Sequence, residues 1–174
     1  MIMNNMSLYA RETLGEAPED YAGIQLALRF GSKCLLGFGL GWLVTKMHAK
    51  ASLLATTSIC IAGVAWALFV PGKLYLLSFG LLGGGELFYV YYVNYIVGCS
   101  KPERMRENTA YTNLITVSIG FLPLVYGLVS DQFGLRASFV TAIGILVMAL
   151  IVVQSRLPEQ PALPDSEASG SPDS

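Results

Sequence analysis

Residues 26–44 read LALRFGSKCLLGFGLGWLV, an apolar stretch that carries two cations, Arg29 and Lys33. Its length is close to the roughly 20 residues that an α-helix needs to cross a bilayer core about 30 Å thick. A charge at the middle of such a helix costs about 3 kcal/mol on insertion scales. The stretch therefore predicts a membrane-spanning helix whose charged stripe faces a wet cavity or an anion.

The composition of the whole chain also indicates a membrane protein. Of its 174 residues, 53% are hydrophobic and only 13% are charged, whereas soluble domains carry about a quarter charged residues. The net charge of −1 says nothing about nucleic acid, but no basic run suggests such a partner, and we expect none. The three cysteines do not have the spacing of metal ligands, and we expect neither a metal nor a cofactor.

Five apolar stretches of about 18 to 24 residues predict five spanning helices. The stretches are Ile24–Thr45, Ser52–Val70, Leu74–Val97, Tyr111–Val129 and Ala137–Gln154. None alternates with the period of a barrel strand, and helices are the other way to satisfy backbone hydrogen bonds in lipid. The expected fold class is all-α, a polytopic transmembrane helix bundle.

The polar ends of the chain set the expected domain limits. Residues 1–20 would form an extracytoplasmic stub and linker, and residues 21–156 the five-helix transmembrane domain. Residues 157–174 combine proline, serine and acidic residues, and we expect a disordered cytoplasmic tail.

Lysines and arginines near the helix ends predict the orientation, because cytoplasmic loops are enriched in them. One side of the membrane would receive six of these cations and the other side three. The six are Lys46, Lys50, Lys101, Arg104, Arg106 and Arg156, and the three are Arg11, Lys73 and Arg136. We therefore expect a multi-pass protein of the cell membrane (inner or plasma membrane) whose C-terminus is cytoplasmic.

Two parts of the chain align as a faint repeat. Pro18-Glu19 precedes the helix that ends at Gly41, and Pro102-Glu103 precedes the helix that ends at Gly127. Three helices separate equivalent positions, so the copies must cross the membrane in opposite directions, as inverted repeats of secondary transporters do. The helix that should open the first copy is missing, and residues 1–16 are expected to be the stub of a helix whose body lies upstream.

A loop motif carries a resemblance to a known family. The motif G-x-x-x-D-x-x-G-x-R occurs at Gly127, Asp131, Gly134 and Arg136, after the joint SKPERMRENTAY. Together with the paired helices, this pattern resembles the C-terminal half of a major facilitator superfamily transporter over about residues 8–156. The resemblance implies a partial fold of that family, in which the five helices match the eighth to twelfth of its twelve.

The loop after the first helix matches the family's cytoplasmic signature only in part. It keeps Gly41, Lys46 and Lys50. It departs at Thr45, where an acid is usual, and at His48 and Ala49, where glycine and arginine are usual. The resemblance therefore implies a gating loop motif here but does not carry over a gating salt bridge.

The best candidates for contacting a solute lie on two helices. Arg29 and Lys33 share one helical stripe, and Lys33 would sit roughly 14 Å below the outer surface. Glu86, on the third helix, would lie at about 18 Å, close to the same depth. We expect Lys33 or Arg29 to meet Glu86 across a central cavity. The pair would form either a substrate site or a charge pair that the substrate or a proton opens, and the alternative is a permanent ion pair that joins two helices.

Two further candidates for contacting the solute are Tyr89 and Asn113. Tyr89 follows Glu86 and could line the cavity, whereas the tyrosines after it suit the aromatic belt of the membrane interface. Asn113 shares one face of the fourth helix with Pro123 and Gly127, and Pro123 would kink that helix as a hinge. Close packing between helices is the alternative role of this face.

The sequence thus predicts solute transport as part of a secondary active transporter of the major facilitator type, as a truncated C-terminal half. Expected partners are the lipid bilayer, a small solute for which the cations favour an anionic or zwitterionic nature, and the missing N-terminal helices or a partner bundle. The chain has no nucleophile–base constellation, and we expect no enzyme. The alternative is a structural or regulatory integral membrane protein that does not transport.

Overall fold

A computed structural model of the chain describes residues 3–15 and 18–158, so the predicted tail lies outside the described residues beyond Pro158. The described elements are all helical, and the prediction of an all-α fold is confirmed. The α-helices are α1 (Met3–Leu14), α2 (Ala22–Lys46), α3 (Ala49–Phe69), α4 (Leu77–Gly85), α5 (Phe88–Cys99), α6 (Met105–Ile119), α7 (Leu122–Phe133) and α8 (Leu135–Arg156). Short 3₁₀ helices are η1 (Pro18–Tyr21), η2 (Gly72–Leu76) and η3 (Pro102–Arg104).

Among the described residues, four helical segments are long and apolar enough to cross a membrane. They are Ala49–Phe69, Gly72–Cys99, Met105–Phe133 and Leu135–Arg156, and they match the second to fifth predicted helices. The first predicted helix is α2, which has 25 residues and therefore sufficient length. Because Arg29 and Lys33 lower its mean hydropathy, α2 is less apolar than these four segments.

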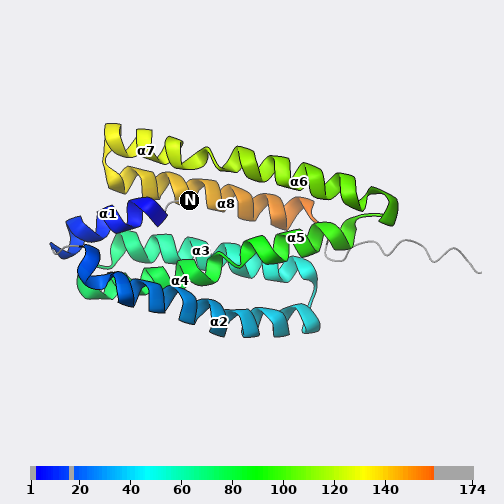
Figure 1. The fold of residues 1–174 in the computed structure, drawn as a ribbon, viewed down its shortest axis with the longest axis horizontal. Helices are drawn as coiled ribbons and strands as arrows, with labels where there is room; N and C mark the ends of the chain where they lie inside the picture. Colours follow the sequence, from blue (N-terminus) through cyan, green and yellow to red (C-terminus); the bar gives the residue numbers. More distant parts are fainter. Residues whose placement is uncertain (1–2, 16–17, 159–174) are drawn as a thin grey trace, which may run out of the picture.

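The helices alternate in direction along the long axis of the bundle (Figure 1). The pair α2–α3 runs out and back, and the pair α6/α7–α8 starts from the opposite end and runs the other way. A 3₁₀ turn, η1 or η3, precedes each pair at its Pro-Glu sequence. The two pairs are therefore antiparallel copies of one arrangement, the geometry that an inverted repeat requires.

The helix α3 is the centre of the bundle, where it packs against α2, α4, α5 and α8. Its buried side chains include Thr56 and Val64, which are almost fully enclosed. The hydroxyl of Thr56 donates to the backbone oxygen of Ser52 at 2.8 Å, so this polar group is satisfied within its own helix.

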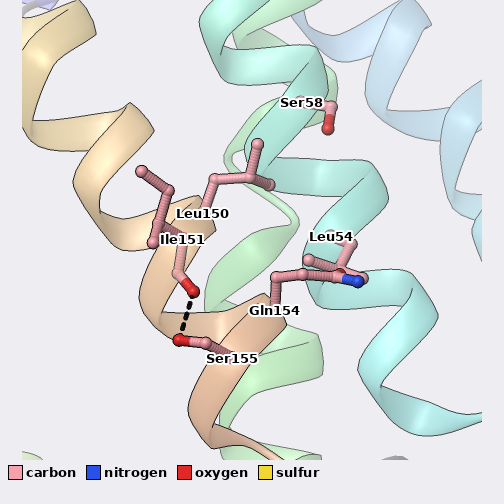
Figure 2. Close-up of a pocket in the computed structure, with 6 residues that line it drawn as sticks. All are labelled: Leu54, Ser58, Leu150, Ile151, Gln154 and Ser155. Atoms are coloured by element: carbon pink, nitrogen blue, oxygen red, sulfur yellow. Dashed lines mark hydrogen bonds between the residues drawn. The ribbon is translucent and has the colours of Figure 1, made fainter.

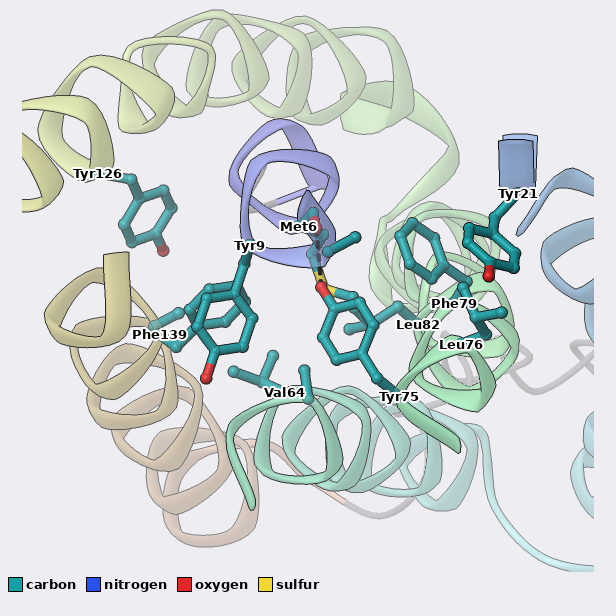
Figure 3. Close-up of a cluster of buried hydrophobic side chains, with 13 residues drawn as sticks. Met6, Tyr9, Tyr21, Val64, Tyr75, Leu76, Phe79, Leu82, Tyr126 and Phe139 are labelled. Carbon is teal, nitrogen blue, oxygen red and sulfur yellow. Dashed lines mark hydrogen bonds between the residues drawn. The ribbon is translucent and has the colours of Figure 1, made fainter. Parts of the chain in front are cut away.

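The helix α1 packs into the main core at one end of the bundle (Figure 3). Met6 and Tyr9 of α1 lie buried beside Tyr75 and Phe139. The Tyr75 hydroxyl donates to the Met6 backbone oxygen at 2.8 Å, and the Tyr9 ring lies 5.0 Å from that of Phe139. The 12 described residues of α1 are fewer than the roughly 20 of a spanning helix, and they pack into this core.

Candidate functional site: a charged cluster between two membrane helices

The third spanning segment is interrupted where its acid lies. The helix α4 ends at Gly85 and α5 begins at Phe88, with Glu86 and Leu87 in a turn between them. Across this turn the backbone tightens: the Leu87 N–H donates to the Gly84 oxygen at 3.1 Å, and the Val90 N–H donates to the Leu87 oxygen at 3.0 Å. The Glu86 carboxylate thus projects from a break in a membrane helix, a feature that the sequence analysis did not predict.

Glycines on α4 let this helix approach α2 closely. A Cβ atom added at Gly83 would collide with the backbone of Arg29, and one added at Gly80 would lie 2.7 Å from the Ser32 hydroxyl oxygen. At Gly84 the added atom would meet the end of the Leu36 side chain. Small residues allow such close contact between membrane helices. The close approach brings the charged stripe of α2 next to the break after α4.

The Glu86 carboxylate interacts with both cations of α2: it accepts hydrogen bonds from Arg29 and forms a salt bridge with Lys33. Arg29 Nε donates to Glu86 Oε2 at 3.1 Å, and Arg29 Nη2 donates to Oε1 at 2.5 Å. Lys33 Nζ lies 2.5 Å from Oε2. The structure therefore brings together the three charged residues that the sequence analysis singled out, with one carboxylate between two cations.

The cluster is half-buried within the membrane-spanning part of the chain. The Glu86 side chain is 13% exposed, against 34% for Arg29 and 26% for Lys33. Both cations also lie near the ring of Phe30, with Lys33 Nζ at 5.1 Å from its centroid. The carboxylate forms the inner part of the cluster, and the cations its outer part.

The structure does not bring Tyr89 and Asn113 to this cluster. Tyr89 is 49% exposed on α5, and Asn113 is exposed on α6. Within residues 3–15 and 18–158, no hydrogen bond joins either side chain to the charged cluster. A direct role for these two residues at this cluster has no support in the geometry.

The fourth spanning segment is also interrupted, close to Pro123. The helix α6 ends at Ile119 and α7 begins at Leu122, with the proline in the first turn of α7. A proline at position i cannot donate to the oxygen of residue i−4, so the ladder opens just before it. Gly120 and Phe121 bridge the gap with hydrogen bonds to residues three positions earlier.

The two predicted loop motifs differ in their contacts. At the first loop Lys46 is exposed, but Lys50 is only 8% exposed, and its Nζ donates to the Gln154 backbone oxygen at 2.8 Å. Gly41 has open space around it. Lys50 thus satisfies a carbonyl at the end of α8, a contact between distant segments that sequence spacing did not reveal.

At the second loop, Gly134 separates α7 from α8 and has a backbone φ of +85°. Residues with a side chain rarely adopt such an angle. Gly127 is half-buried on α7 with no atom near its Cβ position. Arg136 Nε donates to the Tyr9 hydroxyl of α1 at 3.2 Å. Asp131 is exposed, and within the described ranges it forms no salt bridge with Arg136.

Two open grooves lie outside the charged cluster. One of about 420 Å³ runs along the seam of α3 and α8 (Figure 2) and is lined by Leu54, Ser58, Leu150, Ile151, Gln154 and Ser155. The other, of about 290 Å³, lies between α2, α3 and α4 and includes Ser32, Trp66 and Gly80. Neither groove is lined by a residue predicted to contact the solute. Within residues 3–15 and 18–158, no three His, Cys, Asp or Glu side chains gather as metal ligands would.

A comparison with sequence families decides the identity of the chain. The profile of the Major Facilitator Superfamily matches residues 1–172, nearly the whole sequence. The chain belongs to this superfamily. It is therefore a multi-pass membrane protein of a transporter family, in agreement with its apolar helices. Searches of curated proteins and of solved structures gave no match.

Proposed function

We propose that the chain forms the C-terminal half of a secondary active transporter of the major facilitator type, in which the cluster of Arg29, Lys33 and Glu86 contacts the solute. The main support for this proposal is the cluster itself, in which three charged side chains lie together within the membrane-spanning part of the chain. Intramembrane charges are costly, and they mark transport pathways more often than simple packing. The helix order and the antiparallel pairs support an assignment to the eighth to twelfth helices of the family.

The exposed surface of α6 and α7 supports a partner bundle. Only 11% of an 18-residue apolar window in the segment Met105–Phe133 is buried. Asn113 on this segment exposes an amide at a depth of about 12 Å from the start of α6. An amide facing hydrocarbon is unfavourable because it loses its hydrogen bonds with water. We infer that the N-terminal helices of a complete transporter cover this surface.

The proposed orientation places the C-terminus in the cytoplasm. Lys46, Lys101 and Arg156 belong to the end of the bundle at which α2, α5 and α8 finish, and Lys73 and Arg136 belong to the opposite end. The excess of cations at the first end favours the cytoplasm. In this orientation α1 lies on the outer side.

Transport in this proposal proceeds by rocking of the bundle against its partner. We expect the spanning helices to bend at their two interruptions, Glu86-Leu87 and Gly120-Phe121. The cluster holds two cations against one carboxylate, which favours an anionic or zwitterionic solute. An ion gradient would supply the energy.

Flux through reconstituted liposomes tests this proposal. The full-length gene product is assayed with a panel of labelled organic anions, amino acids and sugars, beside its Glu86→Gln variant. Lys101→Gln is the matched control, because Lys101 is an exposed loop cation. We expect uptake of at least one solute to fall at least about tenfold in Glu86→Gln, because the charge-assisted contacts by which Glu86 holds Arg29 and Lys33 in place are lost. Uptake should persist in Lys101→Gln. Equal uptake by Glu86→Gln and the parent would contradict a solute-contacting role for the cluster.

The competing function is a membrane scaffold that does not transport. The bidentate hydrogen bonding of Arg29 with Glu86 favours this function, because the same geometry suits a permanent ion pair between helices. In that case the panel would give no flux, while Glu86→Gln would still lower the stability of the bundle.

A further inference from the structure

The two cations of the cluster differ in how they hold Glu86. Arg29 engages both carboxylate oxygens through two of its nitrogens. Its backbone is also pressed against Gly83, where a Cβ atom has no room. Arg29 and Glu86 therefore join α2 to the turn after α4 through two hydrogen bonds between their planar groups.

Lys33 makes a salt bridge to Glu86 through one oxygen only. Its Nζ meets Glu86 Oε2, the same oxygen that accepts from Arg29 Nε. An ammonium carries three N–H donors, and within residues 3–15 and 18–158 the carboxylate is the one salt-bridge partner of Lys33. Lys33 thus retains donors for another acceptor.

The charge of the cluster is not balanced. Two cations share one carboxylate, and the other salt bridge in the described ranges is that between Arg29 and the same Glu86. A net charge of one positive unit within a membrane is costly unless an anion or water compensates it. One negative charge on a ligand would neutralise the cluster.

The surroundings place this missing charge beside Lys33. The lysine side chain is twice as exposed as the carboxylate behind it, 26% against 13%. Phe30 is 55% exposed, its ring centroid lies 5.1 Å from Lys33 Nζ, and the ring offers a flat apolar surface beside the ammonium. An incoming organic acid would meet the cation with its carboxylate and the aromatic ring with its apolar body.

We propose that Lys33 is the anion-binding group of the cluster and that its ligand is an organic monocarboxylate with an apolar body, while Arg29 and Glu86 hold α2 and α4 in place around it. This inference rests on the proposed function, since it names the solute class of the same cluster. A carboxylate fits because it repeats at Lys33 the contact that Glu86 already makes. Its apolar body packs against Phe30.

Binding of benzoate to the purified chain in detergent tests this inference by calorimetry at constant chloride. Benzamide is the neutral molecule of the same shape, and benzylammonium is its cationic counterpart. The variants are Lys33→Gln, Lys33→Arg and Glu86→Gln, and Lys101→Gln is the matched lysine control. Circular dichroism and gel filtration establish that each variant is folded.

The unaltered chain is expected to bind benzoate with saturation, and benzamide and benzylammonium at least about tenfold more weakly. Lys33→Gln is expected to raise the benzoate Kd about 10- to 100-fold, the loss of one charge-assisted hydrogen bond. Lys33→Arg and Lys101→Gln should stay within about threefold of the parent. Glu86→Gln should bind benzoate more tightly, because the competing carboxylate is gone, while its thermal stability falls.

Benzoate binding that is absent, that benzamide matches, or that survives Lys33→Gln unchanged would overturn the inference. These outcomes are distinct from failure of the proposed function. A chain that gives flux sensitive to Glu86→Gln but binds benzoate independently of Lys33 keeps the function and loses the inference. A chain without flux whose benzoate binding requires Lys33 keeps the site and loses transport.

Discussion

The close contact of α4 with α2 makes Gly83→Ala the most informative substitution for stability. An added Cβ would lie 2.8 Å from Arg29 Cα and 3.0 Å from its carbonyl carbon, and closer still to the carbonyl oxygen. All three atoms belong to the backbone, so no side chain can rotate away. The two helices must separate, and Glu86 would then recede from Arg29.

The expected magnitude follows from two opposing terms. Overpacking of this kind costs about 1–3 kcal/mol. Replacing a helical glycine by alanine returns up to about 1 kcal/mol. With the full return, the net destabilisation against the parent is about 0–2 kcal/mol. Against a glycine-to-alanine control elsewhere in a helix, which gains the same return, it is about 1–3 kcal/mol, and for a chain of this size Tm then lies about 2–12 °C below that of the control.

Thermal unfolding in detergent, followed by far-ultraviolet circular dichroism, measures this change. Gly39→Ala on α2 is the matched control, because an added Cβ there meets no atom within 4 Å. The control should leave Tm unchanged or raise it slightly. If Gly83→Ala and Gly39→Ala unfolded within about 1 °C of each other, the close approach of α2 and α4 would be refuted.

Three further substitutions test other contacts. Lys50→Met removes the donor to the Gln154 oxygen and should lower the free energy of unfolding, measured by denaturant titration, by about 1–3 kcal/mol. Lys101→Met, at an exposed lysine, should lower it by less than about 0.5 kcal/mol. Equal losses in the two variants would contradict the burial of Lys50. Gly134→Ala forces a side chain into a backbone conformation with φ +85° and should cost about 1–3 kcal/mol, whereas Gly144→Ala, which has open space, should not lower Tm. Tyr75→Phe removes the hydrogen bond to Met6 and should weaken the attachment of α1 by about 1 kcal/mol, so amide hydrogen exchange in α1 should become about fivefold faster. Unchanged exchange would show that other contacts hold α1.

The positions of the spanning helices follow directly from the sequence, because in lipid a long apolar stretch has few alternatives to a helix. The meeting of the charged residues was also predictable in outline. Lys33 and Glu86 have similar depths when each residue adds about 1.5 Å along a helix. Depth alone cannot decide between Arg29 and Lys33, which are one turn apart. The structure brings both to the carboxylate because the break at Glu86-Leu87 and the glycines of α4 set the approach.

Contacts between distant segments were beyond the sequence analysis. Lys50 reads as one more cytoplasmic cation, and its burial depends on α8 ending beside the start of α3. Likewise α1 reads as a polar stub, but Met6 and Tyr9 belong to a core whose described residues come from seven elements. Such positions are fixed by packing in three dimensions, for which a local pattern carries no signal.

A double-mutant cycle on Arg29 and Glu86 tests the central claim most directly. The free energy of unfolding in detergent is measured for the parent, Arg29→Gln, Glu86→Gln and the double variant. The account predicts a coupling of about 1 kcal/mol or more, because the first substitution already removes the shared contact and the second then costs less. Losses that add to within about 0.3–0.5 kcal/mol would contradict it, because the two side chains would then not interact.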